Sequence, residues 1–286
     1  MDVNTLKKPV ITVAVLLVLA VVFGVSVSLV LHKLHQLRET RAAAKTTSVA
    51  YSNEGSFLFK AGRYQEAVTA CDQAIAINPD SVDAYLNKGA SLARLGKEAE
   101  GVAAIDKAIV IDPANLQAYY YKGKLFLNAG KYADALAAYD KAIGLDAKSA
   151  EAYFGKGNAL FGMDKYEEAL AAYDKASQLE PGFAGAYGNR GVVLRKLGRP
   201  EEALASYEKE IRLDPKNAQA YNSKGVALFE LKRYEDSVAA FDTAISIDPG
   251  FAEAYNNESY ALTQLGRKKE AEDAFRQAVE LNPALK

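Results

Sequence analysis

The sequence predicts an all-α fold, a solenoid of seven stacked helix-turn-helix units preceded by one transmembrane helix. Two observations support the solenoid: one pattern recurs every 34 residues from Ser48 to Leu285, and a proline ends nearly every copy. A stretch without charged residues near the N-terminus supports the transmembrane helix. Self-similarity at this period indicates stacked supersecondary units rather than a globule around one enclosed active site.

Residues 10–31 are predicted to form a membrane anchor behind a short flank, residues 1–9. These 22 residues contain no charge and are rich in Val and Leu. As a helix they would span about 33 Å, enough for a hydrocarbon core of about 30 Å. The alternative is a cleaved signal peptide, whose apolar region is shorter and is closely followed by small residues. The first such small residues, Ala42-Ala43-Ala44, lie beyond several charges, so an uncleaved anchor is favoured.

The basic residues around the anchor favour the repeats on the cytoplasmic side. Two lysines precede the span, and four basic residues follow it: Lys33, Arg38, Arg41 and Lys45. The flank richer in Lys and Arg usually stays in the cytoplasm. Residues 32–47 are predicted to be a basic helical stalk that leads into the first repeat. Its histidines, His32 and His35, have no neighbouring ligand cluster, so neither a metal nor a cofactor is predicted.

Small residues follow one face of the predicted anchor at a spacing of four. They are Ala20, Gly24 and Ser28. Small residues at this spacing let two transmembrane helices approach closely, which raises the alternative of a homodimer through this face. Such triplets also arise often by chance in spans that contain Ala and Ser.

Each copy of the repeat predicts two antiparallel helices. In residues 116–149, apolar positions recur at three and four residues in two blocks, separated by Asn128-Ala129-Gly130. A glycine inside the first helix costs about 1 kcal/mol against alanine. An alanine follows this glycine twelve residues later in most copies, so we expect the two small residues to meet where the helices cross. The proline then ends the second helix.

The recurring positions resemble those of the tetratricopeptide repeat family. They are an opening tyrosine (Tyr51, Tyr85, Tyr119, Tyr153, Tyr187, Tyr221, Tyr255), a glycine (Gly55, Gly89, Gly123, Gly157, Gly191, Gly225) and a closing proline (Pro79, Pro113, Pro181, Pro215, Pro249, Pro283). The resemblance implies a right-handed superhelix of seven repeats: 48–81, 82–115, 116–149, 150–183, 184–217, 218–251 and 252–285. Departures include lysine or arginine before the glycine, and Pro200 and Glu210 in repeat five, which we expect to be the soft point of the stack.

The last repeat carries charges where the others carry apolar residues. One position of the second helix is Val or Leu in six copies and becomes Glu272, and its neighbour is Ala from copy two onward and becomes Asp273. Because a terminal repeat needs a polar outer face, we expect repeat seven to cap the array.

In this family the first helices line a concave groove that binds a peptide segment of a partner protein. Carried over position by position, the groove residues are Leu86, Tyr120, Tyr121, Lys124, Phe154, Asn158, Phe161, Asn189, Arg195, Asn222, Phe229, Asn256 and Tyr260. Rings between amides suit a buried anchor side chain and hydrogen bonds to a peptide backbone. The alternative is that some rings only pack on the next repeat. Tyr120 and Phe154 are the strongest candidates for ligand contact.

The sequence predicts neither catalysis nor nucleic-acid binding. The chain has a formal net charge of −1, and its carboxylates alternate with Lys and Arg as on a solvated helical surface. The lone Cys71 stands where other copies have Ile105, Tyr139 or Phe241, so we expect it to be buried. The predicted function is a membrane-anchored adaptor for protein or peptide partners. The alternatives are a self-associating scaffold and a non-catalytic subunit of a membrane assembly or translocation complex.

Overall fold

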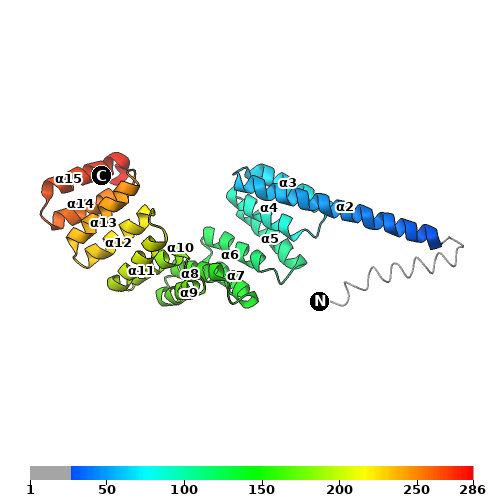
Figure 1. Ribbon diagram of the computed structural model, residues 1–286, viewed down its shortest axis with the longest axis horizontal. Coiled ribbons are helices and arrows are strands. Elements are labelled where there is room, and N and C mark those ends of the chain that lie inside the picture. The colour runs from blue at the N-terminus through cyan, green and yellow to red at the C-terminus, as the bar shows by residue number, and fades with distance from the viewer. Residues whose placement is uncertain (1–26, 286) are drawn as a thin grey trace. The chain divides into compact units, whose positions relative to one another are not determined.

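The computed structural model describes residues 27–285, which form fourteen α-helices and a closing 3-10 turn, with no strand in this range (Figure 1). The helices fall into two units, of which the first ends at Pro113 and the second begins at Ala114. The first unit contains α2 (Val27–Lys60), α3 (Tyr64–Ile77), α4 (Val82–Arg94) and α5 (Glu98–Ile111). Helix α2 is continuous from the predicted stalk into repeat one, which confirms that the stalk leads helically into the first repeat.

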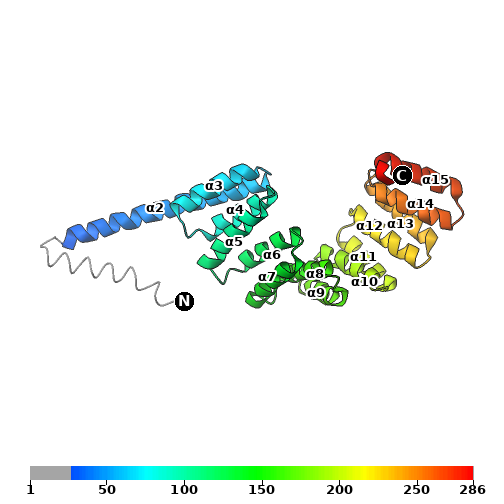
Figure 2. The ribbon, with the colours of Figure 1, turned by 180° about the vertical axis from the view of Figure 1, so that it is seen from behind.

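The second unit contains five helical pairs, one for each of repeats three to seven. They are α6 (Leu116–Asn128) with α7 (Tyr132–Leu145), α8 (Ala150–Gly162) with α9 (Tyr166–Leu179), α10 (Ala184–Lys196) with α11 (Pro200–Leu213), α12 (Ala218–Glu230) with α13 (Tyr234–Ile247), and α14 (Ala252–Gln264) with α15 (Lys268–Leu281). The two helices of a pair pack against each other, and each pair packs on the next, as the view from behind also shows (Figure 2).

Local sequence sets the ends of the helices. In five copies the turn between the paired helices contains a glycine with positive φ, such as Gly130 at 69°. Asp164 and Lys232 take this left-handed conformation in repeats four and six. Each second helix ends two residues before the recurring proline, and α7 ends at the same point without one. Pro200 is the first residue of α11, where its missing N–H costs nothing.

The recurring glycine lets an aromatic ring reach the first helix. A Cβ on Gly157 would lie 2.6 Å from Cε1 of Tyr173, and a Cβ on Gly191 would lie 2.5 Å from Cε1 of Tyr207. The expectation that this glycine meets the alanine twelve residues later is confirmed in repeat one, where a Cβ on Gly55 would lie 3.3 Å from the carbonyl oxygen of Ala67. In repeats four and five the closest neighbour is the ring sixteen residues later. A ring buries far more apolar surface than a methyl group, and this offsets the cost of the glycine. Cys71 occupies the ring's position in repeat one and is buried, as predicted.

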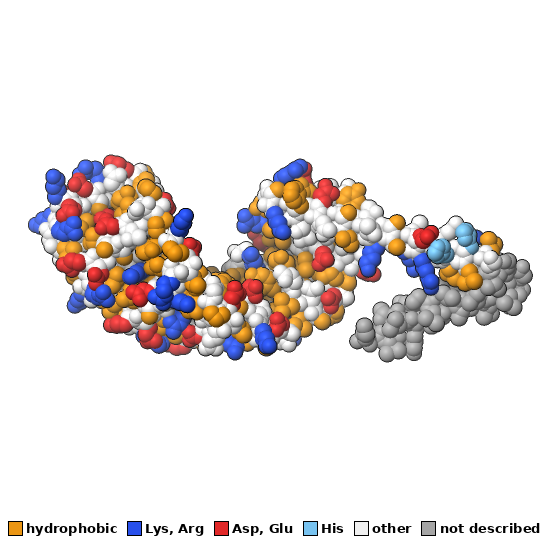
Figure 3. All heavy atoms as spheres, viewed as in Figure 1, with side chains coloured by type: hydrophobic (Ala, Val, Ile, Leu, Met, Phe, Trp, Pro, Cys, Tyr) orange, Lys and Arg blue, Asp and Glu red, His pale blue; other side chains and the backbone are white. Residues whose placement is uncertain are grey.

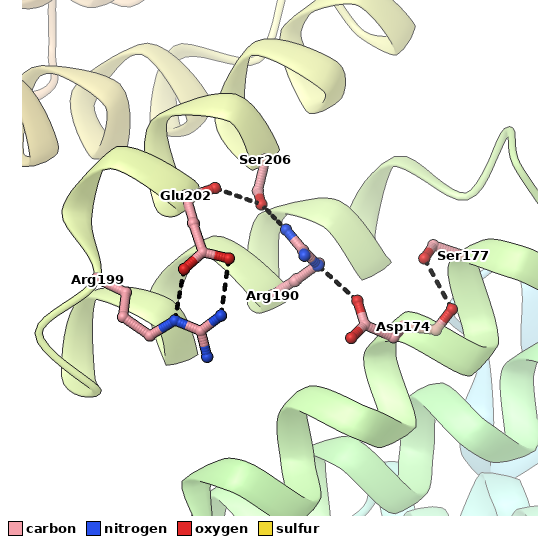
Figure 4. Close-up of polar contacts among 6 residues, drawn as sticks. All are labelled: Asp174, Ser177, Arg190, Arg199, Glu202 and Ser206. Carbon is pink, nitrogen blue, oxygen red and sulfur yellow. Dashed lines mark hydrogen bonds and ion pairs between the residues drawn. The ribbon is translucent and has the colours of Figure 1, made fainter.

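Ion pairs join successive repeats on another side of the first helices. A cation just before the glycine contacts an acid sixteen residues earlier, in the preceding second helix. The pairs are Lys88–Asp72 (2.6 Å), Lys156–Asp140 (2.7 Å), Arg190–Asp174 (2.6 Å) and Lys224–Glu208 (3.4 Å). Figure 4 shows Arg190 between Asp174 and Ser206. These contacts explain why the chain departs from an apolar residue at this position.

The two positions on which the capping prediction depends differ in burial along the array. The position of Glu272 is buried or half-buried in the earlier copies, as in Val238 and Leu204, and Glu272 itself is exposed. The position of Asp273 is different, because Ala103, Ala171 and Ala239 are exposed there too. The prediction that this second position receives a following repeat was therefore wrong.

No helix within residues 27–285 is long and apolar enough to cross a membrane. Residues 1–26, which hold most of the predicted anchor together with Ala20 and Gly24, lie outside the described residues. Ser28 lies in α2 and is exposed. The anchor, its orientation and the pairing face therefore stay predictions.

Candidate functional site

The predicted groove positions differ widely in exposure. Leu86, in the first unit, and Asn222 are buried, at 4% and 1% exposure, so their side chains serve the packing of the repeats. Lys124 and Tyr260 are exposed. The others are half-buried: Tyr120, Tyr121, Phe154, Asn158, Phe161, Asn189, Arg195, Phe229 and Asn256.

Several of the predicted rings pack on other rings of the stack. Tyr120 lies 6.0 Å from Tyr139 between ring centroids. Phe154 lies 5.7 Å from Tyr173 and 4.8 Å from Phe183, the residue that precedes α10. Structural packing, the alternative for these rings, is therefore part of their role, and truncating them would disturb the stack as well as any groove.

A small pocket lies on the first helices of repeats four and five. It has a volume of about 110 Å³ and is lined by Asn158, Phe161, Tyr173, Asn189 and Val192. The Tyr173 hydroxyl donates to Oδ1 of Asn158 at 2.7 Å, and Nδ2 of Asn189 donates to the same oxygen at 2.8 Å. Three of the predicted groove residues thus converge in one place. Sequence reasoning missed Tyr173 and Val192, because Tyr173 belongs to the second helix and Val192 carries no polar signal.

A second amide network joins repeats six and seven. Asn257 donates from Nδ2 to Oδ1 of Asn222 at 3.0 Å, and Asn222 donates from Nδ2 to Glu253 at 3.4 Å. These bonds satisfy the buried amide of Asn222, which would otherwise be costly to bury. Asn222 therefore holds two repeats together, and its amide is not free for a ligand.

Repeat five replaces a ring by a carboxyl group. Gly188 stands where repeats three and four have Tyr120 and Phe154, and a Cβ on Gly188 would lie 2.5 Å from Oε1 of Glu210. That same oxygen accepts a hydrogen bond from Nδ2 of Asn217 at 3.2 Å. Burial, together with the nearby charge of Asp214, raises the pKa of Glu210 to about 7. In the sequence, Glu210 stands out as a departure from the repeat pattern, but the pattern does not connect Glu210 with the glycine at position 188.

Beside this carboxyl, Arg195 forms a two-pronged ion pair with Glu230 of the next repeat. Nη2 lies 2.6 Å from Oε1, and Nε lies 3.1 Å from both carboxylate oxygens. The ring of Tyr207 is 1% exposed, and within residues 27–285 no group accepts the proton of its buried hydroxyl, although the guanidinium of Arg195 lies near enough to act on the hydroxyl oxygen. Burial raises the pKa of Tyr207 to about 12, and the positive charge of Arg195 acts against this rise.

The described residues show no grouping with evident reactive chemistry. Residues 27–285 hold no group of His, Cys, Asp and Glu that suits a metal ion. Burial and the nearby charge of Asp72 raise the pKa of the Cys71 thiol to about 12, which makes it a poor nucleophile. The first helices instead offer groups suited to recognition: rings, amides and the half-buried guanidinium of Arg195.

Profiles of tetratricopeptide repeats match most of the chain. One matches residues 120–182, 154–218 and 189–250, a second matches residues 55–96, and a third matches residues 82–115 and 252–285. No curated protein matches.

Solved structures of similar fold cover much of the chain. YrrB, described as a TPR protein with an unusual peptide-binding site, is 26% identical over 64% of this chain and 94% of its own, with a TM-score of 0.54. PilF of Pseudomonas aeruginosa is 22% identical over 72% of this chain and 93% of its own, with a TM-score of 0.63. A structure of MamA is 25% identical over 60% of this chain and 94% of its own, with a TM-score of 0.51. These likenesses establish an all-α repeat solenoid.

Proposed function

Because this chain belongs to the tetratricopeptide repeat family, we propose that it is a non-catalytic adaptor that binds a segment of a partner protein along the first helices of repeats four to six. The observation that supports this proposal is the pocket formed by Asn158, Phe161, Tyr173, Asn189 and Val192. Its volume of about 110 Å³ is well below the roughly 300–1,000 Å³ of small-molecule sites, and suits one side chain of a peptide.

The amides of the pocket have the polarity that a peptide backbone requires. Oδ1 of Asn158 accepts two hydrogen bonds, so its orientation is set by Tyr173 and Asn189. This leaves Nδ2 of Asn158 to donate and Oδ1 of Asn189 to accept. A backbone amide offers one acceptor and one donor, so the two asparagines can bind a peptide unit while an apolar side chain lies against Phe161 and Val192. YrrB, which is similar to this chain, is described by its peptide-binding site, in line with this mode.

We test this with a random peptide library displayed on phage and selected on the full-length protein. The affinity of each selected peptide is then measured for the wild type and for the N158A/N189A variant. This variant removes both amide groups and changes no aromatic residue. We expect at least about a tenfold loss of affinity, equal to about 1.4 kcal/mol. N53A is the matched control, because Asn53 is exposed and occupies the position of Asn189 in repeat one. Equal binding by the folded double variant would reject this surface.

We further propose that residues 10–31 anchor the adaptor in a membrane, with the repeats on the cytoplasmic side. The 22 uncharged residues and the basic stalk after them support this. The checks are resistance of the protein to carbonate extraction and digestion of the repeats by protease added to inside-out vesicles. Release by carbonate would remove the anchor from the proposal. Self-association of full-length protein, unaffected by N158A/N189A, would instead favour the scaffold.

A further inference from the structure

Repeat five contains a tyrosine hydroxyl whose proton has no acceptor. The ring of Tyr207 is held against Gly191, where its Cζ lies 2.7 Å from the position of a Cβ, and packs with Leu194 and Val192. In repeat four, the equivalent Tyr173 donates to Asn158. The residue that replaces Asn158 in repeat five is Val192, which cannot accept. A buried hydroxyl whose proton has no acceptor loses the hydrogen bond that it would donate to water, so it needs an explanation.

A second donor lies next to this hydroxyl. Arg195 is the only charged residue at its position among the seven copies, the others being Phe59, Ala93, Leu127, Phe161, Phe229 and Thr263. Its side chain is 25% exposed and binds Glu230 through Nε and Nη2, and the same guanidinium is a hydrogen-bond donor toward the oxygen of Tyr207. An arginine has donors only, so it cannot accept the proton of Tyr207. The guanidinium of Arg195 and the hydroxyl proton of Tyr207 therefore lie together, and a ligand that binds both must be an acceptor.

The carboxylate of Glu230 shows which kind of acceptor suits Arg195. Glu230 is also placed so that it can move away from Arg195. Its carboxylate takes the two-pronged arrangement with Arg195 that is specific to carboxylates and similar planar anions. Glu230 is the last residue of α12, and 37% of its side chain is exposed. It can turn into solvent when a second carboxylate arrives. The exchange replaces one ion pair by another and adds the hydrogen bond from Tyr207.

We propose that Arg195 and Tyr207 form a subsite for a carboxylate of the bound peptide, and that Glu230 occupies Arg195 until this carboxylate displaces it. The proposal rests on the proposed function, because the same peptide segment also lies in the pocket of Asn158 and Asn189. The carboxylate comes from an Asp or Glu side chain or from the C-terminus of the partner. The subsite lies at the end of α10, three residues beyond Val192, which lines that pocket.

The test uses nonapeptide libraries with a fixed central residue, Asp, Glu, Asn or Gln, each made with a free or an amidated C-terminus. Retention on immobilised full-length protein is measured by mass spectrometry. We expect at least about fivefold higher retention of the acidic libraries, or of the free C-termini, over their amide counterparts. Preference for a central acid identifies a side chain, and preference for the free C-terminus identifies a terminal carboxylate. Equal retention of acids and amides by the wild type overturns the subsite.

Three variants separate this subsite from general electrostatics. R195Q should abolish the preference for acidic peptides and keep the binding of the amide libraries. Y207F should reduce this preference. E230Q should increase the retention of acidic peptides, because the carboxylate that occupies Arg195 is removed. The matched controls are R199Q and E202Q, which make the same charge changes in an exposed ion pair of repeat five (Figure 4). If the controls shift retention as much as R195Q and E230Q do, the subsite is wrong.

Failure of the proposed function gives a different result. In that case the wild type retains every library no better than the N158A/N189A variant does. If retention is lost in N158A/N189A but does not differ between acidic and amide libraries, the carboxylate subsite is rejected and the proposed adaptor function stands. Phe241 occupies the position of Tyr207 in repeat six and is fully packed, so Y207F is expected to fold, and its circular dichroism checks this.

Discussion

Repeats four and five have the same backbone plan and opposite chemistry on their first helices. Both pairs run 13 and 14 residues, and both bury a tyrosine against a glycine. Three positions of the first helix differ, because Phe154, Asn158 and Phe161 of repeat four become Gly188, Val192 and Arg195 in repeat five. A buried position of the second helix differs as well, where Ala176 becomes Glu210. The helices therefore tolerate exchange of these side chains, and the surface they present is set copy by copy.

The exchange between the two repeats is coordinated rather than piecemeal. In repeat four the ring of Phe154 packs at a tilt against Phe183, and the small Ala176 stands at the position of Glu210. In repeat five the ring is missing at Gly188, and the space is filled by Glu210 bonded to Asn217. Asn217 stands at the position of Phe183. Two rings and an alanine in repeat four are thus replaced by a glycine and two hydrogen-bonded polar side chains in repeat five. Each replacement fits only when the other two are present.

The largest effect is expected from breaking this set with G188F. The new ring would need the space of the Glu210 carboxyl, and we expect the free energy of unfolding to fall by about 3 kcal/mol. Adding E210A and N217F recreates the set of repeat four and should recover more than half of this loss. Urea unfolding of the three proteins measures both steps. A triple variant no more stable than G188F would show that the sets are not interchangeable.

The pH dependence of stability should also distinguish the two repeats. The pKa of Glu210 is raised from 4.5 to about 7, so the folded chain binds a proton more tightly than the unfolded chain. Its stabilising effect is therefore complete below pH 4.5 and is lost as the pH rises through about 7. After allowance for solvent screening we expect about 1–2 kcal/mol.

The matching variant is E210Q, and the measurement is the melting temperature between pH 5 and 8. E210Q should reduce the decline of the melting temperature with pH, but it should not remove this decline. The reason is Glu258 in repeat seven, whose pKa is also raised to about 7 by burial and by its neighbour Asp242. The double variant E210Q/E258Q should remove most of the remainder. An unchanged slope in both variants would contradict these pKa shifts.

The two buried tyrosines should respond differently to loss of the hydroxyl. Y173F loses a hydrogen bond to Asn158 and leaves an amide oxygen with one donor fewer, which should cost about 1 kcal/mol. Y207F loses no protein hydrogen bond and should be neutral or stabilising. Chemical unfolding of the two variants side by side is the measurement. A loss for Y207F as large as for Y173F would mean that the hydroxyl of Tyr207 has a partner in the free protein.

The comparison of these repeats also shows what sequence patterns can and cannot predict. Period, helix ends and the burial of Cys71 follow from local rules repeated seven times, so they were predictable. The glycine contact was predicted only in part. The residues twelve and sixteen positions after the glycine both return to the point where the helices cross, and the larger side chain at the second position makes the closest contact. The pocket was found only in part: Asn158, Phe161 and Asn189 follow from their positions, but Tyr173 reaches the pocket from the second helix.

The smallest effect on stability is expected from exchanging Arg195 for the residue of repeat four. R195F removes the ion pair with Glu230, but both side chains are partly exposed, so the pair stabilises by at most about 0.5–1 kcal/mol. Phe161 and Phe229 show that a ring fits this position, packed on Tyr166 and Tyr234. We therefore expect unfolding of R195F to change little while its selection of acidic peptides is lost. A large loss of stability would mean that Arg195 serves the packing of the repeats, and that its place beside Tyr207 is structural.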